Sequence, residues 1–338
     1  MISLKVKEYI QRKIKLTSYP KILNIETTNF CNLNCPMCVA KDTREQGFLD
    51  IDFLKRIIRE NKKVLSRQFI WLHFNGEPLL HPHLSEIIKI LKKNRIRTRF
   101  STNAVLLNKK KALELMEAGL DYIVFSIDGY IKKSYENIKL GANFEKVEDN
   151  IRNFLEIKKD KGFKTKTQVQ FIKMKENKGE EKLFINKWRK TDINYINIKS
   201  FCSRAGKVYG MDRFIDISTL IKRIKRRLPC FYFWETLVIL WNGKVICCCQ
   251  DLLGELEVGD LKKETLIDIW NSPKLIELRK KQLENDFSTG PCRDCPDWKF
   301  VPNRYVSYFF DSAIKWFFKE IFKKEKKDEG INIIFNKK

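Results

Sequence analysis

The first 200 residues alternate between two patterns of hydrophobic and polar positions. Short runs rich in Ile, Val, Phe and Thr are typical of β-strands, whereas apolar residues spaced three or four positions apart are typical of amphipathic helices. Strands that alternate with helices predict βαβ units, and therefore an α/β fold with a parallel sheet. Six repeats fit an open, doubly wound sheet or an incomplete barrel, and both folds place their site at the C-terminal ends of the strands. The six predicted strands are residues 22–28, 69–74, 97–102, 122–127, 167–172 and 195–200.

The pattern changes after residue 200. Residues 203–229 are basic and irregular, which predicts a linker. Asn242 and Gly243 then stand between two apolar runs, and Asn-Gly in that position indicates a β-hairpin. Apolar residues at helical spacing follow between 266 and 278. We therefore expect a second, small module of hairpin and helix at residues 230–298.

Both ends of the chain are basic. Residues 1–21 predict an N-terminal basic helix, and residues 299–338 form a basic amphipathic tail. Within that tail, the apolar residues of 306–324 lie largely along one side of a predicted helix, and lysines flank them. Such a helix either docks on the protein's own core or lies on the inner face of an anionic membrane.

Composition narrows the class of protein. The chain has 338 residues, 43% hydrophobic and 32% charged, so it has enough apolar material for a core and is not disordered throughout. Its length suits about two domains. No apolar run reaches the roughly 18 residues of a membrane-spanning helix, and the N-terminus has no signal-peptide pattern, which favours a cytoplasmic protein. The net charge of +25 attracts polyanions or anionic membranes, or else reflects a lysine-rich solvated surface.

The ten cysteines are the clearest chemical signal. Cys31, Cys35 and Cys38 follow the first predicted strand on one short loop. Three thiolates there can each bind one iron of a cubane cluster and leave the fourth iron open for a substrate or cofactor. Zinc is the alternative, but a zinc site has four protein ligands or a catalytic histidine set, and the three histidines of this chain are distant in sequence.

With this spacing after the first strand of a six-repeat β/α chain, the sequence resembles the radical S-adenosylmethionine (radical SAM) enzymes. The resemblance implies a partial (β/α)6 TIM barrel over residues 22–202. It also implies that Cys31, Cys35 and Cys38 hold a catalytic [4Fe–4S] cluster whose open iron binds the amino and carboxylate groups of SAM. One electron then cleaves SAM to methionine and a 5′-deoxyadenosyl radical, which abstracts a substrate hydrogen. We expect reduced flavodoxin or ferredoxin to supply that electron in an anaerobic cytoplasm.

Further segments at the predicted strand ends resemble the SAM-binding segments of this family. Residues 74–78 resemble its GGEP segment, with Asn75 in place of the first glycine and Glu77 as the acid that holds the SAM ammonium. Lys139 stands where many relatives carry arginine, and it can pair with the SAM carboxylate without a bidentate fork. The residues that the resemblance implies for SAM binding are Met37, beside the adenine, and Asn75, Gly76, Glu77, Pro78, Ser101, Asn103, Ser126, Asp128 and Lys139.

Residues 230–298 resemble the auxiliary-cluster domain of many radical SAM enzymes, which has a long SPASM form and a short twitch form. The cysteine pattern fits the twitch form with one [4Fe–4S] cluster, and the implied ligands are Cys230, Cys248, Cys292 and Cys295. A four-cysteine zinc site uses the same ligands and stays open as an alternative. Only its spacing from Gly243 selects Cys248 among three consecutive cysteines. The role of the other cysteines, Cys202, Cys247 and Cys249, stays open.

The expected function is that of a radical SAM oxidoreductase. Four protein ligands leave the auxiliary cluster no open iron, so we expect it to accept the electron left on the substrate radical in a two-electron oxidation. The substrate stays open among a sugar or aminocyclitol, a membrane lipid or glycan, and a peptide. One alternative is a redox-neutral epimerase or peptide maturase with Cys202 or Cys249 as hydrogen donor. The alternative of another class is a zinc-stabilised nucleic-acid-binding module; otherwise we expect no nucleic-acid partner.

Overall fold

The computed structural model describes residues 3–38, 44–202, 205, 227–299 and 332–335. The strands are β1 (Lys21–Ile25), β2 (Phe69–Trp71), β3 (Arg97–Thr102), β4 (Tyr122–Ser126), β5 (Lys166–Lys173), β6 (Tyr195–Ser200), β7 (Thr236–Ile239), β8 (Lys244–Ile246), β9 (Glu257–Asp260) and β10 (Asn332–Phe335). The helices are α1 (Leu4–Ile10), α2 (Ile51–Glu60), α3 (Lys62–Leu65), η1 (Pro78–Leu80), α4 (Leu84–Lys93), α5 (Lys109–Glu117), α6 (Lys132–Ile138), α7 (Phe144–Asp160), α8 (Glu181–Trp188), α10 (Tyr232–Glu235), α11 (Leu266–Trp270), α12 (Pro273–Leu283) and η3 (Gly290–Cys292).

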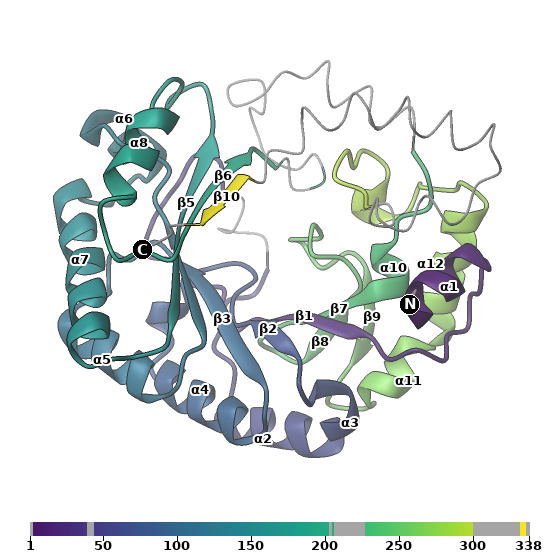
Figure 1. The fold of residues 1–338 in the computed structure, drawn as a ribbon. Helices are drawn as coiled ribbons and strands as arrows, with labels where there is room; N and C mark the ends of the chain where they lie inside the picture. Colours follow the sequence, from purple (N-terminus) through teal and green to yellow (C-terminus); the bar gives the residue numbers. More distant parts are fainter. Residues whose placement is uncertain (1–2, 39–43, 203–204, 206–226, 300–331, 336–338) are drawn as a thin grey trace.

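All of these strands belong to one curved sheet, in the order β10-β6-β5-β4-β3-β2-β1-β7-β8-β9. Strands β1 to β6 are parallel neighbours in chain order. Within the part of the chain that the structure describes, the two end strands β9 and β10 do not pair, so the barrel stays open. The expected α/β fold, a partial (β/α)6 TIM barrel, is confirmed. Figure 1 shows the helices of the β/α repeats along the outside of this curved sheet.

The two faces of the sheet differ in how they are packed. Residues that point outward, such as Ile70, Phe100 and Phe125, are fully buried beneath the helices and belong to the main hydrophobic core. Residues that alternate with them point inward and stay half-exposed, as Trp71 and Arg99 do. Because successive side chains of a strand lie on opposite faces, this pattern separates a structural outer face from an inner face that ligands can reach.

The predicted hairpin forms, and it continues the barrel sheet. β7 pairs in parallel with β1, while β8 and β9 add antiparallel strands beyond it. Gly243 takes a φ of +91° in the turn, and a Cβ there would lie 2.6 Å from the Phe53 ring. The pairing of β7 with β1 was not predicted, because local patterns do not specify which distant strand is the partner.

Side chains of the small module hold the segment between α1 and β1. Buried Arg279 donates to the backbone carbonyls of Ile14, Phe233 and Trp270, and Trp270 Nε1 donates to the carbonyl of Ser18. These bonds satisfy backbone groups that have no sheet or helix partner. The module and the start of the barrel therefore share one core.

The ends of the chain differ from the sequence expectations. The N-terminal helix covers only Leu4–Ile10 of the expected 1–21, since Arg12 adopts a left-handed φ of 54° and ends the helical path. Strand β10 lies within 299–338 and was not predicted; it pairs antiparallel with β6. The predicted amphipathic helix at 306–324 and most of the 203–229 linker lie outside the described residues. Among the helices of the described ranges, none has the length and apolarity needed to cross a membrane.

Candidate functional site

The loop with the first three cysteines lies at the C-terminal edge of the sheet, directly after β1. The carbonyl of Phe30 accepts a 2.7 Å hydrogen bond from the amide of Glu77, and Asn34 donates to the carbonyl of Leu140 at 3.0 Å. Gly76 has a φ of +77°, and a Cβ on it would lie 2.5 Å from the Phe30 carbonyl oxygen. The segments after β2 and after α6 therefore close around this loop, and Gly76 allows the close approach.

The three thiols of this loop are near enough to influence one another electrostatically. Burial, together with the charges of Glu77, Cys38 and Cys35, raises the pKa of Cys31 to about 11. Burial also raises the pKa of Cys35, against the opposing effect of Lys139. Iron removes these protons on binding, because the thiolate is the ligand. Three soft sulfur donors on one short loop suit an iron–sulfur cluster.

Glu77 is the acid beside the cysteine loop and is almost fully buried. Its Oε1 accepts hydrogen bonds from Thr102 Oγ1 at 2.7 Å and from the amide of Leu79 at 3.1 Å, and its Oε2 accepts from the amide of Asn103 at 2.8 Å. Burial raises the pKa of Glu77, although these donors oppose the rise. A carboxylate has about four acceptor positions, so one position stays available beside the cysteine loop.

Ser126, Asp128 and Lys139 form a polar group on the other side of the loop, in which Asp128 and Lys139 are buried and Ser126 is half-buried. Lys139 Nζ lies 2.6 Å from Asp128 Oδ2 and 3.2 Å from Ser126 Oγ, while Asp128 Oδ1 accepts from the amide of Ile172 at 2.8 Å. Burial alone would lower the pKa of Lys139, but the charges of Asp128 and Cys35 outweigh burial and raise it. Lys139 is thus a fixed cation with Asp128 as its protein partner.

The remaining residues that were singled out for SAM lie around the same edge. Asn103 Nδ2 donates to Asn32 Oδ1 of the cysteine loop at 2.9 Å. The amide of Ser101 donates to His73 Nδ1 at 3.1 Å on the inner face. Met37 packs against the small apolar cluster of Ile138 and Met174. Pro78 is buried at the start of η1, directly after Glu77.

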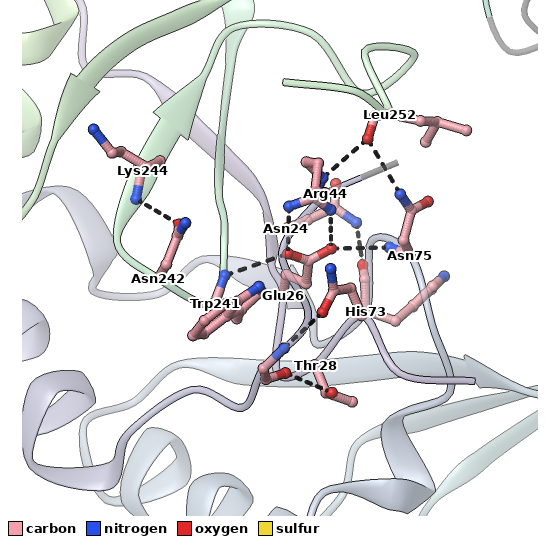
Figure 2. Close-up of polar contacts among 12 residues, drawn as sticks. Asn24, Glu26, Thr28, Arg44, His73, Asn75, Trp241, Asn242, Lys244 and Leu252 are labelled. Atoms are coloured by element: carbon pink, nitrogen blue, oxygen red, sulfur yellow. Dashed lines mark hydrogen bonds and ion pairs between the residues drawn. The ribbon is translucent and has the colours of Figure 1, made fainter. Parts of the chain in front are cut away.

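Figure 2 shows a polar cluster that the sequence reading missed. Buried Glu26 forms a bidentate ion pair with Arg44, and the amides of Asn75 and Trp241 donate to its two carboxylate oxygens at 3.3 Å. Arg44 Nε and Asn75 Nδ2 both donate to the carbonyl of Leu252, at 3.0 and 3.4 Å. The cluster connects the cysteine loop, the segment after β2 and the small module. An acid inside an apolar strand run was the only signal in the sequence.

The four cysteines of the small module come together around Cys230. All four are buried, and Cys230 interacts electrostatically with Cys292, Cys248 and Cys295. Burial raises the pKa of Cys230 to about 11. Three donors face these sulfurs: Lys299 N to Cys230 at 3.3 Å, Gln250 N to Cys248 at 3.4 Å and Gln282 Nε2 to Cys292 at 3.7 Å. Such donors suit thiolates that carry negative charge in a cluster.

The other three cysteines lie close by, in different surroundings. Cys247 is fully buried and also interacts with Cys230 and Cys292, so position alone does not separate it from Cys248. Cys249 packs against the apolar cluster of Phe74, Val238, Leu240, Ile246 and Leu252. Cys202 Sγ donates to Gln250 Oε1 at 3.3 Å. Within the described ranges, no three His, Cys, Asp or Glu side chains converge tightly enough to hold a single metal ion.

Comparison with known proteins agrees with this arrangement. The sequence profile of the Radical SAM superfamily matches residues 25–176, and that of the SPASM iron–sulfur cluster-binding domain matches residues 230–296. These profiles imply a [4Fe–4S] cluster with SAM in the barrel and auxiliary iron–sulfur binding in the small module.

Curated relatives share part or most of the chain. The "Tungsten-containing aldehyde ferredoxin oxidoreductase cofactor-modifying protein" of Pyrococcus furiosus is 23% identical over 81% of this chain and 87% of its own length. A "Probable GTP 3',8-cyclase" of Methanococcus maripaludis is 31% identical over 39% of this chain and 45% of its own length.

Solved structures show the same fold. The crystal structure of BtrN with AdoMet and 2-DOIA has a TM-score of 0.55 at 19% identity, over 84% of this chain and 94% of that one. Streptococcus suis SuiB bound to precursor peptide SuiA has a TM-score of 0.65 at 17% identity, over 91% and 78% of the two chains. The profiles, the shared fold and the two cysteine groups lead to one conclusion: the chain belongs to the radical SAM superfamily and carries a SPASM-type iron–sulfur domain.

Proposed function

We propose that this radical SAM enzyme is an oxidoreductase that removes two electrons from its substrate. The observation that carries the radical SAM part of the proposal is the meeting of Cys31, Cys35 and Cys38 with Glu77 and the Asp128–Lys139 pair at the C-terminal edge of the sheet. The oxidation is argued from the four buried cysteines around Cys230. Cys31, Cys35 and Cys38 hold the catalytic cluster. When bound, this cluster and SAM supply the one-electron chemistry that removes a hydrogen atom from the substrate.

The residues around the cysteine loop bind and orient SAM. Glu77 has one acceptor position left for an N–H of the SAM amino group. Lys139 carries three donors, and its contacts with Asp128 and Ser126 use two, so the third can meet the SAM carboxylate. Ser101 and Asn103 lie on β3 and just after it, toward the ribose, and Met37 lies beside the adenine. Asn75, Gly76 and Pro78 fix the segment that presents Glu77.

The small module accepts the second electron. Cys230, Cys248, Cys292 and Cys295 supply four ligands, so the auxiliary [4Fe–4S] cluster has no iron left for the substrate. An auxiliary cluster held by these four cysteines would supply an acceptor for the electron that remains on the substrate after hydrogen-atom removal, and solvent would take up the proton. Reduced flavodoxin or ferredoxin supplies the electron that starts each turnover.

Metal content tests both clusters at once. Iron, sulfide and zinc per chain are measured on anaerobically purified protein and on a variant with Cys31, Cys35 and Cys38 changed to Ala. We expect about eight irons in the wild type and about four in the variant, as one cubane in each half requires. Cys202→Ala is the matched control and keeps about eight. Zinc without iron, even after reconstitution, would exclude the proposal and favour a zinc-stabilised binding module.

A redox-neutral reaction is the second candidate, and the place of Cys249 favours it. Cys249 packs with Leu23 against an apolar cluster separate from the main core, on the inner-face side of the sheet. There its thiol could give a hydrogen atom to a substrate radical. A cluster held by Cys230, Cys248, Cys292 and Cys295 would supply the electron, and solvent the proton, that restore the thiol. In deuterated water this route places one solvent deuterium in the product, and Cys249→Ala abolishes the labelling. The oxidation leaves the product unlabelled.

A further inference from the structure

Side chains from neighbouring strands stand side by side on the inner face of the barrel. The parallel register places Arg99 beside Trp71 of β2 and beside Tyr122 of β4. Thr98 and Phe100, its neighbours in sequence, point outward and are fully buried, so Arg99 points inward. Arg99 and Trp71 are both half-exposed on this face.

The guanidinium of Arg99 is held between aromatic rings instead of by an acid. Its Cζ lies 4.3 Å from the ring centre of Phe69 and 4.2 Å from that of Trp71. Its Nε is buried and has no hydrogen-bond partner in the described part of the chain. Burial lowers the pKa of Arg99 to about 10, which still leaves the group charged at neutral pH. A desolvated cation with an unused donor is costly unless a ligand completes its contacts.

A second cation lies near Arg99. Burial lowers the pKa of Lys21, and the charges of Arg99 and Lys299 lower it further, while Glu235 opposes them. Glu235 is itself in an ion pair with Lys299, so that acid is shared. The six parallel strands, β1 to β6, contain no Asp or Glu at all. The inner face near Arg99 is thus positively charged without a matching acid on its own strands.

The aromatic side chains around Arg99 form a rigid wall. Tyr122 and Tyr195 stack with ring centres 5.7 Å apart and planes 19° apart, and Phe69 meets Tyr122 edge-on at 6.2 Å. Tyr122 is fixed further because its hydroxyl donates to Gln168 Oε1 at 2.7 Å. A planar guanidinium packed on fixed rings keeps its fork in one orientation, which favours two-point binding of an anion.

We propose that Arg99 binds an anionic group, a carboxylate or a phosphate, of a small-molecule substrate on the inner face of the sheet. This inference rests on the proposed function, which places SAM and the removal of the hydrogen atom at the C-terminal edge of the sheet. Ser101 stands two residues further along β3, about 7 Å closer to the C-terminal edge at the usual strand rise. An anion at Arg99 therefore places the attached carbon atoms between Arg99 and the SAM-binding edge, where a hydrogen atom is removed.

Calorimetric titration of the reconstituted enzyme with inorganic phosphate and with malonate tests the proposal. We expect one of the two to bind the wild type, and Arg99→Gln to weaken that binding about tenfold or more, since bonds to a charged partner are lost. Tighter binding of phosphate indicates a phosphate ester as substrate, and tighter binding of malonate indicates a carboxylate. Arg97→Gln is the matched control, because Arg97 lies on the same face of the same strand but is exposed, and it also packs on Phe69.

The variants of Arg99 and Arg97 separate support for the proposal from its refutation. Binding that is lost in Arg99→Gln and kept in Arg97→Gln supports the proposal. No binding to the wild type, or equal weakening in both variants, overturns it. If Arg99→Gln does not fold, Arg99→Lys keeps the charge but loses the fork, and unchanged affinity in that variant also overturns the proposal. SAM cleavage with dithionite is measured in parallel: anion binding without cleavage contradicts only the proposed function, and cleavage without anion binding contradicts only this inference.

Discussion

Arg44 and Glu26 form a buried bidentate ion pair, with Nη2 2.6 Å from Oε1 and Nη1 3.1 Å from Oε2 (Figure 2). The Glu26 side chain is fully buried and that of Arg44 is only 10% exposed. Arg44 follows the cysteine loop, Glu26 follows β1, and both reach the small module through Leu252 and Trp241. The pair therefore joins the two cluster-binding halves of the molecule.

Removal of one partner leaves the other charge buried without compensation. We expect Arg44→Gln to lower the free energy of unfolding by about 3 kcal/mol, and the double variant Glu26→Gln with Arg44→Gln to be less destabilised than the sum of the single variants. Urea unfolding followed by tryptophan fluorescence measures these values. Arg152→Gln, which breaks an exposed pair with Asp149 on α7, serves as the control and changes stability by less than about 1 kcal/mol. Additive effects of the two buried changes would contradict the coupling.

At Gly76 both the backbone conformation and the nearby Phe30 carbonyl oppose a side chain, whereas at Gly162 only the backbone conformation does. Alanine there takes a φ of +77° and meets the Phe30 carbonyl, whereas alanine at Gly162 takes a φ of +67° with nothing within 4 Å. We expect Gly76→Ala to displace the segment that presents Glu77 and to weaken SAM binding about tenfold or more. Gly162→Ala costs about 1 kcal/mol of stability from its backbone alone and leaves SAM binding unchanged. Equal SAM affinity in both variants would refute the close approach.

The raised pKa of Glu77 predicts how SAM affinity changes with pH. Because the pKa of Glu77 is raised in the folded protein, its ionisation costs stability, and that cost grows as pH rises through the raised pKa. The N–H donors of the SAM amino group favour the ionised form of Glu77, so SAM affinity should rise with pH over the same interval. Glu77→Gln should remove this dependence and weaken binding about tenfold or more. It should also lower SAM-free stability, because the amide nitrogen that replaces one oxygen would face the N–H of Asn103 or of Leu79. A pH dependence of SAM affinity that persists in Glu77→Gln would contradict the prediction. Glu60→Gln, at an exposed site on α2, is the control.

The sequence predicted the fold where a local pattern determines the element. Strands β3 and β6 have the predicted bounds, because their alternating residues stay in the ladder to the end. Strand β1 ends at Ile25 instead of residue 28, since Thr27 leaves the ladder and its hydroxyl donates to the carbonyl of Leu72. Strand pairings between distant segments could not be predicted in this way, because neither the pairing of β7 with β1 nor that of β10 with β6 has a local sequence pattern.

The candidate site shows the same division. The cysteines and Glu77 stand in short motifs of fixed spacing, so their neighbourhood was predictable. Arg44 contacts Glu26 from 18 residues away and Leu252 from 208, and no spacing rule relates these positions. The partner of Lys139 was also unforeseen: the sequence suggested only the SAM carboxylate, whereas the structure has Asp128 at 2.6 Å. Contacts of this kind depend on how separate loops pack at the strand ends.

Single substitutions of Cys247, Cys248 and Cys249 identify which of these consecutive cysteines is a cluster ligand. Cys248 accepts a hydrogen bond from the amide of Gln250 and interacts with Cys230, which suits a ligand, but Cys247 interacts with Cys230 as well. We expect Cys248→Ala to reduce iron from about eight to about four atoms per chain, while Cys247→Ala and Cys249→Ala keep about eight. Electron paramagnetic resonance of the dithionite-reduced proteins identifies which cluster is lost. Loss of four irons in Cys247→Ala alone would show that Cys247, and not Cys248, is the ligand. The ligand would then be determined by burial beside Arg279 and not by the spacing from Gly243.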